Sequence, residues 1–176
     1  MKNFKMLMSV VAVLCILICA GNALAGIKAG AITLSPSGGG YLFDDDRNIS
    51  DGPFYNLGLG YNFTQNLAAE LSFGLIQTDT PDCNCEDTDV FGFLPRLEIL
   101  YHFMPEKRLV PYIAVGGGYL SYDYDSDNVK KEVDKSAVAD YGLGAKLFLT
   151  DNLALRGDAR HIYDFENEAN DFAFTV

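Results

Sequence analysis

The sequence predicts an all-β fold, an eight-stranded antiparallel up-and-down transmembrane β-barrel in a single domain. Three observations lead to this prediction. The chain begins with a segment typical of exported proteins, eight later segments alternate large apolar residues with small or polar ones, and short connections alternate with long ones. Alternating strands have two chemically different faces, and segregated connections favour a barrel that crosses a membrane.

The first 25 residues of the 176-residue chain have the pattern of a secretory signal peptide. Lys2 and Lys5 supply positive charge, residues 6–20 form a nearly unbroken apolar run, and Ala23-Leu24-Ala25 is a small-x-small cleavage site. We therefore divide the chain into a signal peptide, 1–25, and a β-barrel domain, 26–176. The later residues hold no helix-period apolar run of about 20 residues, so any membrane crossing must use strands.

An alternating hairpin at residues 55–75 is the clearest structural signal. Large apolar residues occupy the odd positions on both sides of the turn-prone residues 64–66, and small or polar residues occupy the even positions. Period-2 alternation is typical of strands, and the short turn makes the pair antiparallel. Each strand has about 9–11 residues, the length that a tilted strand needs to cross a bilayer. Alternation alone does not say which face is inside, so a soluble ligand-binding barrel stays open as an alternative.

Six further segments complete the eight predicted strands. They span residues 28–43, 90–103, 109–122, 137–149, 153–163 and about 172–176. The segment at 109–122 has an unclear phase, because residues 110–115 are apolar on both faces. The last segment is short, so we expect either that the final strand is truncated at Val176 or that the barrel closes on a short strand.

The predicted connections fall into two length classes. The short ones are 64–66, 104–108 and 150–152, and the long ones are 44–53, 78–89, 123–136 and 164–171. Short periplasmic turns and long extracellular loops are typical of outer-membrane barrels, as are aromatic residues near strand ends on the apolar face. Such aromatic residues are Tyr55, Tyr61, Phe63, Phe91, Tyr101, Phe103 and Tyr163. The sequence therefore predicts the Gram-negative outer membrane, with membrane lipid and lipopolysaccharide around the protein.

Negative charge is concentrated in the four long connections. The chain has a formal net charge of −11, which argues against nucleic acid as a partner. The long connections hold 18 acidic and four basic residues. Solvated loops explain this pattern, and binding of divalent cations is the alternative. Asp123, Asp125 and Asp127 have the spacing of calcium ligands but lack the glycine and the distant glutamate of an EF-hand, so we predict no defined metal site and no cofactor.

The small face of the predicted strands carries a balanced set of charges. Its acidic members are Glu70, Glu98, Asp140 and Asp158, and its basic members are Arg96, Lys146, Arg156 and Arg160. Charges inside a narrow barrel must be paired or hydrated, because a lone desolvated charge costs several kcal/mol. We therefore predict a salt-bridge network that plugs the lumen. A narrow, low-conductance ion path is the alternative.

No arrangement of residues indicates an enzyme. His102 lies on the small face near a turn and His161 on the apolar face, and no serine can be paired with either from the sequence. We interpret both histidines as membrane-interface residues. The pairing of Cys83 with Cys85 stays open, since a Cys-x-Cys disulfide closes a very small ring.

Several motifs, in order along the chain, resemble the OmpA-like eight-stranded outer-membrane β-barrel domain. They are Gly58-Leu59-Gly60-Tyr61-Asn62-Phe63-Thr64-Gln65-Asn66, Tyr101-His102-Phe103, Val110-Pro111-Tyr112 followed by Gly116-Gly117-Gly118, and Phe148-Leu149-Thr150-Asp151-Asn152-Leu153-Ala154. The resemblance implies a protein that anchors in the Gram-negative outer membrane and stabilises the envelope, with adhesion or small-channel activity in some relatives. Two departures concern the end of the chain. The sequence shows no attached peptidoglycan-binding domain, and its last strand stops at Val176 short of the aromatic residue that ends many relatives.

Overall fold

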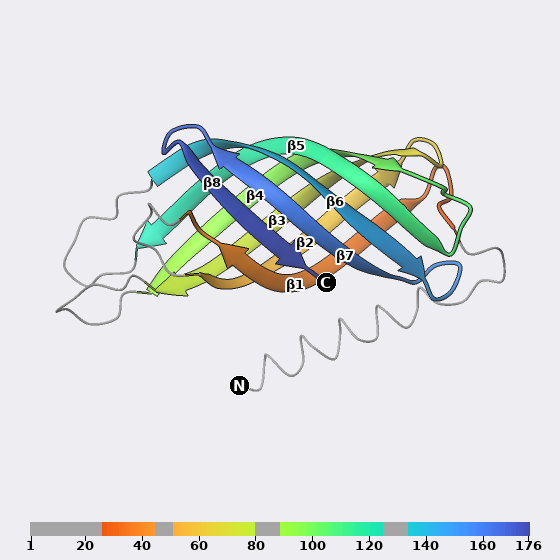
Figure 1. The fold of residues 1–176 in the computed structure, drawn as a ribbon, viewed down its shortest axis with the longest axis horizontal. Coiled ribbons are helices and arrows are strands. Elements are labelled where there is room, and N and C mark those ends of the chain that lie inside the picture. The colour runs from red at the N-terminus through yellow and green to blue at the C-terminus, as the bar shows by residue number, and fades with distance from the viewer. Residues whose placement is uncertain (1–25, 45–50, 80–88, 125–133) are drawn as a thin grey trace.

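Eight antiparallel strands close into a barrel in the computed structural model, which describes residues 26–44, 51–79, 89–124 and 134–176 (Figure 1). Each strand pairs with the next along the chain, and the last pairs with the first. The strands are β1 (Ile32–Leu42), β2 (Gly52–Asn62), β3 (Leu67–Asp79), β4 (Asp89–His102), β5 (Leu109–Tyr124), β6 (Asp134–Phe148), β7 (Ala154–Asp164) and β8 (Ala169–Thr175). The predicted fold class is confirmed. Within the described residues no helix is long and apolar enough to cross a membrane.

The connection between β7 and β8 corrects the predicted pattern of loop lengths. β8 begins at Ala169 rather than near residue 172, so only residues 165–168 join the two strands. Asp164 and Asp171, which we expected in a solvated outer loop, are fully buried inside the barrel. The Tyr41 hydroxyl donates a hydrogen bond of 3.0 Å to Asp171. These two carboxylates therefore belong to the barrel interior.

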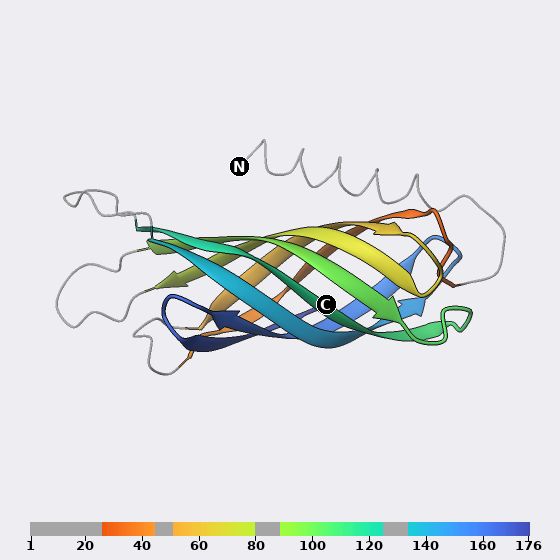
Figure 2. The same cartoon turned by 90° about the horizontal axis from the view of Figure 1, so that it is seen from above.

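The large apolar residues face outward, on the outer side of the wall of strands that Figure 2 shows from a second direction. Leu57 on β2, Leu97 on β4 and Leu143 on β6 keep 45%, 63% and 66% of their surface exposed. In water such a surface would be unstable, whereas lipid covers it at no hydrophobic cost. The alternative of a soluble barrel, with its large residues inside, is therefore wrong. Tyr61 packs edge-on against Phe63, and Tyr101 against Phe103, on this outer surface near the short turns.

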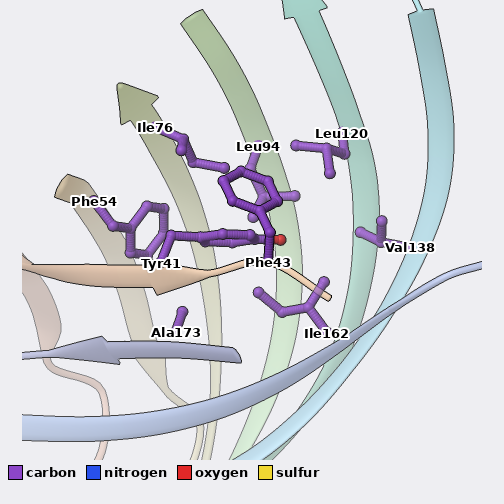
Figure 3. Packing of buried hydrophobic residues seen from close by; sticks show 9 residues of the cluster. All are labelled: Tyr41, Phe43, Phe54, Ile76, Leu94, Leu120, Val138, Ile162 and Ala173. Carbon is purple, nitrogen blue, oxygen red and sulfur yellow. The ribbon is translucent and has the colours of Figure 1, made fainter. Parts of the chain in front are cut away.

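The interior is more apolar than the sequence pattern indicated. Near the end where β7 and β8 connect, nine buried residues form a cluster that we call the loop-side apolar layer (Figure 3). Its members are Tyr41, Phe43, Phe54, Ile76, Leu94, Leu120, Val138, Ile162 and Ala173. We expected small and polar groups on this face. An eight-stranded barrel has an interior just wide enough for side chains, so rings and branched residues from opposite walls can meet and fill it.

The phase of β5, which was unclear from the sequence, is settled by its pairing with β4 and β6. Val110, Tyr112 and Ala114 point inward and are buried, whereas Ile113 and Val115 point outward and are exposed. The inward residues contribute to two smaller apolar clusters near the short turns, one with Leu100 and one with Phe148. Between these clusters and the loop-side apolar layer lie the buried charges.

Candidate functional site

All eight predicted interior charges point into the barrel. Glu70, Arg96, Glu98, Asp140, Lys146 and Arg160 are each at most 6% exposed, and the side chains of Arg156 and Asp158 are 12% and 5% exposed. They come from strands β3, β4, β6 and β7, at positions of one parity. Register therefore brings residues that are distant in sequence close together in the lumen.

Arg156 is the centre of the first group of charges. Its Nη1 atom lies 2.7 Å from Glu70 Oε2 and 2.8 Å from Oε1, across the lumen on β3. Its Nε atom donates at 2.7 Å to Asp158 Oδ2, and its Nη2 atom at 3.2 Å to Asp158 Oδ1. Tyr112 accepts a hydrogen bond of 2.7 Å from Arg156 Nε and donates a short one to Asp158. A guanidinium is suited to this site, because its planar fork can serve two carboxylates at once.

The second group is centred on Arg160. Its Nε atom lies 3.2 Å from Glu98 Oε1, and its Nη2 atom lies 2.9 Å from Asp158 Oδ1. Asp158 thus accepts from both Arg156 and Arg160 and links the two groups. Arg96 approaches Asp140 more loosely, at 3.6 Å. We call these seven residues, with Tyr112, the charged belt: Glu70, Arg96, Glu98, Asp140, Arg156, Asp158 and Arg160.

Lys146 differs from the other seven predicted residues. Its ammonium lies 3.1 Å from His102 Nε2 and 5.4 Å from the centre of the Tyr112 ring. Among the described residues it makes no ion pair with a carboxylate. The strand register places Lys146 directly opposite Arg156, which is another cation. The equal numbers of acidic and basic residues on the inner face suggested a carboxylate partner for Lys146, but the described fold places none within ion-pair distance of it.

The two histidines have different environments. His102 is fully buried in the lumen beside Lys146, so our interpretation of it as a membrane-interface residue is wrong. Its parity on β4 already placed it on the inner face, and its nearness to the turn misled us. His161 lies on the outer face, between the rings of Tyr141 and Phe172.

Glycines on the inner face make room for the charged belt. A Cβ atom added to Gly58 would lie 2.8 Å from the Glu70 carboxylate, and one added to Gly142 would lie 2.7 Å from Arg160 Cδ. At Gly116 it would lie 2.8 Å from Glu98 Cγ, and at Gly118 it would lie 2.9 Å from Arg96 Cγ. Each of these four charged side chains therefore lies over a glycine of a neighbouring strand. This packing of charged side chains against glycines explains why both small and charged residues occur at the inward positions of the sequence.

Replacing Gly58 with alanine should lower the free energy of unfolding by about 1–3 kcal/mol, because overpacking forces a side chain out of its place. The added methyl group would displace the Glu70 carboxylate from Arg156. Urea unfolding followed by circular dichroism measures the change. Gly40→Ala is the matched control, since a Cβ atom at that strand position has nothing within 4 Å. Equal stabilities of the two variants would contradict the packing argument.

Several members of the site were not singled out from the sequence. Tyr112 was missed because the phase of its strand was unclear, and Ser72 and Asn56 because small polar residues on an inner face are common. Ser72 Oγ lies 3.3 Å from Glu98 Oε2, and Asn56 Oδ1 lies 3.5 Å from Arg96 Nη2. All three have even residue numbers, as Glu70 and Glu98 do, and this parity could have placed them on the inner face.

Three other predictions fall outside the described residues. Asp125, Asp127, Cys83 and Cys85 lie outside the described residues, as does the side chain of Asp123. The signal peptide, 1–25, is likewise outside them. The candidate cation loop therefore stays a prediction.

Comparison with known proteins agrees with this architecture. Residues 11–176 match the family described as outer membrane protein beta-barrel domain. Outer membrane protein Omp38 of Acinetobacter baumannii is 26% identical over 165 residues, which cover 82% of this chain and 46% of that protein. Outer membrane porin F of Pseudomonas aeruginosa is 24% identical over 155 residues, which cover 86% of this chain and 44% of that protein. The chain thus spans about half the length of these curated relatives.

Two crystal structures from Pseudomonas aeruginosa share the fold. The outer membrane protein OprG aligns with a TM-score of 0.63 at 16% identity, covering 87% of this chain and 91% of that one. The N-terminal β-barrel domain of OprF aligns with a TM-score of 0.52 at 17% identity, covering 81% and 96%. The family match, the outward apolar surface and the closed barrel of strands agree with one another. The chain belongs to the outer membrane protein β-barrel domain family, whose members lie in the Gram-negative outer membrane.

Proposed function

We propose that the protein is a structural barrel of the outer membrane that stabilises the envelope and has a lumen closed to solutes. The filling of the middle and of the loop-side end of the interior carries this proposal. The loop-side apolar layer occupies one end, and the charged belt occupies the middle. The cavity at the boundary of these layers, beside Phe54 and Arg96, has a volume of about 10 Å³. That is roughly the room of one water molecule.

An ion entering from the loop side would meet two barriers. The first is the loop-side apolar layer, where Tyr41 packs edge-on against Phe54 with ring centres 5.6 Å apart. An ion that passes this layer would lose its hydrating water and gain no polar groups in exchange, which costs free energy. The second is the charged belt, in which Arg156 and Arg160 already bind carboxylates at 2.7 to 3.2 Å. Ion passage would require both layers to rearrange.

Conductance measurements test the closed lumen directly. The purified protein in planar bilayers should give no steady single-channel openings at neutral pH. Replacing Phe54 and Ile162 with alanine should raise the frequency of openings, because both side chains belong to the loop-side apolar layer. Leu57→Ala on the lipid-facing surface is the matched control and should leave the recordings unchanged. Steady openings in the unaltered protein would overturn the proposal.

A narrow ion path is the second candidate. It is favoured by the ionised groups at mid-lumen and by the similarity to a protein named as a porin. On this reading Arg156 would move between Glu70 and other acceptors, and conduction would be low. The same recordings separate the two candidates, since removal of Arg156 should increase current only if the charged belt itself is the barrier.

Partners at the outer surface form a further part of the proposal. The acidic connections predicted from the sequence would face the lipopolysaccharide layer, and divalent cations would bridge the two sets of negative charge. Catalysis has no part in the proposed function.

A further inference from the structure

Two acidic residues of the charged belt, Glu98 and Asp140, approach each other across a glycine. In the strand register, Glu98 on β4 and Asp140 on β6 are both opposite Gly116 of β5. A Cβ atom added to Gly116 would lie 2.8 Å from Glu98 Cγ, so the Glu98 side chain lies over the glycine, in the direction of Asp140. The two carboxyl groups come within hydrogen-bonding reach of each other. We call these two residues the carboxyl pair.

Few hydrogen-bond donors surround the carboxyl pair. Glu98 and Asp140 are each 1% exposed. Among the described residues, both oxygens of Asp140 and the Oε1 atom of Glu98 have no hydrogen-bond donor. Arg96 Nη1 lies 3.6 Å from Asp140 Oδ2, which is an ion pair without a hydrogen bond. An ionised carboxylate in such a place is costly, because a buried charge needs both a partner of opposite charge and hydrogen bonds.

The charges of the belt balance when one of its carboxyl groups carries a proton. Three guanidinium groups lie among four carboxyl groups: Arg96, Arg156 and Arg160 among Glu70, Glu98, Asp140 and Asp158. Lys146 does not make up the difference, because it lies beside His102 and has no carboxylate partner in the described part of the chain. If all four carboxyl groups were ionised, the belt would therefore hold one negative charge in excess.

The other strands around the carboxyl pair contribute polar or apolar groups rather than cations. Ser72 on β3 places its hydroxyl 3.3 Å from Glu98 Oε2, and Tyr112 on β5 bonds to Asp158. β2 and β8 line the small adjoining cavity with residues that are not ionisable, namely Phe54, Asn56, Ala173 and Thr175. The three arginines of the belt are thus the cations that face the carboxyl pair, as far as the structure describes the chain.

We propose that the carboxyl pair is a proton-binding site, in which Asp140 holds one proton and donates it in a hydrogen bond to Glu98. Two carboxylates are both acceptors and repel each other, so they share a site only when one of them is protonated. Glu98 is the acceptor, because it has the Ser72 hydroxyl and an ion pair of 3.2 Å with Arg160. The bound proton leaves three carboxylates for three guanidinium groups. The inference goes beyond the proposed function, since it holds whether or not the lumen conducts.

Infrared spectroscopy of the folded protein in lipid vesicles tests the site, because a protonated carboxyl group has a C=O stretching band distinct from that of a carboxylate. At neutral pH the unaltered protein should show this band. Both Asp140→Asn and Glu98→Gln should lose it, since the pair holds only one proton and the remaining carboxylate then accepts a hydrogen bond from the new amide. Glu106→Gln, on the exposed turn between β4 and β5, is the matched control and should leave the band unchanged.

The dependence of stability on pH gives a second readout. Above about pH 4 an unfolded chain releases the proton of an aspartate, whereas the folded carboxyl pair keeps it. The unfolding equilibrium constant of the unaltered protein should therefore rise about tenfold per pH unit relative to that of Asp140→Asn, until the folded pair also loses its proton. Urea unfolding at a series of pH values, followed by circular dichroism, measures this difference.

Three infrared results would overturn the proposal: no band in the unaltered protein, a band that persists in Asp140→Asn, or a band that persists in Glu98→Gln. The first needs no substitution, so the test holds even where a variant fails to fold. Parallel pH dependence of the unaltered protein and Asp140→Asn would also overturn it, because the folded state would then bind no extra proton at Asp140.

Discussion

Replacing Arg156 with alanine should lower the free energy of unfolding by about 3–5 kcal/mol, the range for breaking a buried ion pair by removing one partner. Arg156 binds Glu70 at 2.7 Å and Asp158 at 2.7 Å. Its loss leaves the Glu70 carboxylate buried without a cation, and leaves Asp158 with Arg160 and Tyr112. Urea unfolding in lipid vesicles, followed by circular dichroism, measures the effect, since the chain has no tryptophan to report by fluorescence.

Two controls isolate the ion pair from simple truncation. Lys107→Ala removes an exposed cation and should change stability by less than about 0.5 kcal/mol. The double variant Arg156→Met with Glu70→Gln removes both charges and keeps side-chain volume, so it should be more stable than Arg156→Ala alone. The single variants Arg156→Met and Glu70→Gln complete the cycle. If the double variant loses as much free energy of unfolding as these two single variants added together, Arg156 and Glu70 are not coupled and the charged belt is not a network.

Placing a lysine at Leu71 should cost about 2–4 kcal/mol, the range for a cation on the lipid-facing surface of a barrel near mid-membrane. Leu71 points outward and is 40% exposed, between the inward residues Glu70 and Ser72. The charge would therefore lie in lipid at the level of the charged belt. Refolding into vesicles at increasing urea measures the loss, and the unaltered protein is the reference.

Gln77→Lys is the matched control for the Leu71 variant. Gln77 lies on the same outward face of β3, six residues nearer the end of the strand, and is exposed. At the membrane interface the same cation should cost only about 0–1 kcal/mol. A loss at Leu71 no greater than at Gln77 would mean that this band of the surface does not contact lipid, and would contradict the orientation of the whole barrel.

Much of the fold was predictable because alternation is a local property. The odd and even positions of 55–75 specify two faces, and the lengths of most connections distinguish the two ends of the barrel. The eight inner charges could be selected for the same reason, since parity alone places Glu98 and Arg96 on the face opposite Leu97. The start of β8 was set too late, because its first three residues, Ala169, Asn170 and Asp171, are small or polar and also suit a loop.

Whether a residue number is odd or even does not determine the height of an inward side chain along the barrel axis, nor which side chain it contacts. Those depend on the stagger between strands, which brings Arg156 on β7 to Glu70 on β3 and leaves Lys146 beside His102. The loop-side apolar layer is likewise a product of closure, because Phe54 and Ile162 are distant in sequence and join one cluster only when the strands close around a narrow lumen. The sequence by itself determined which face of each strand points inward, since that needs only a period of two. Tertiary structure alone decided how the inner face is filled and which inward side chains meet, because both depend on contacts between strands that the local pattern does not encode.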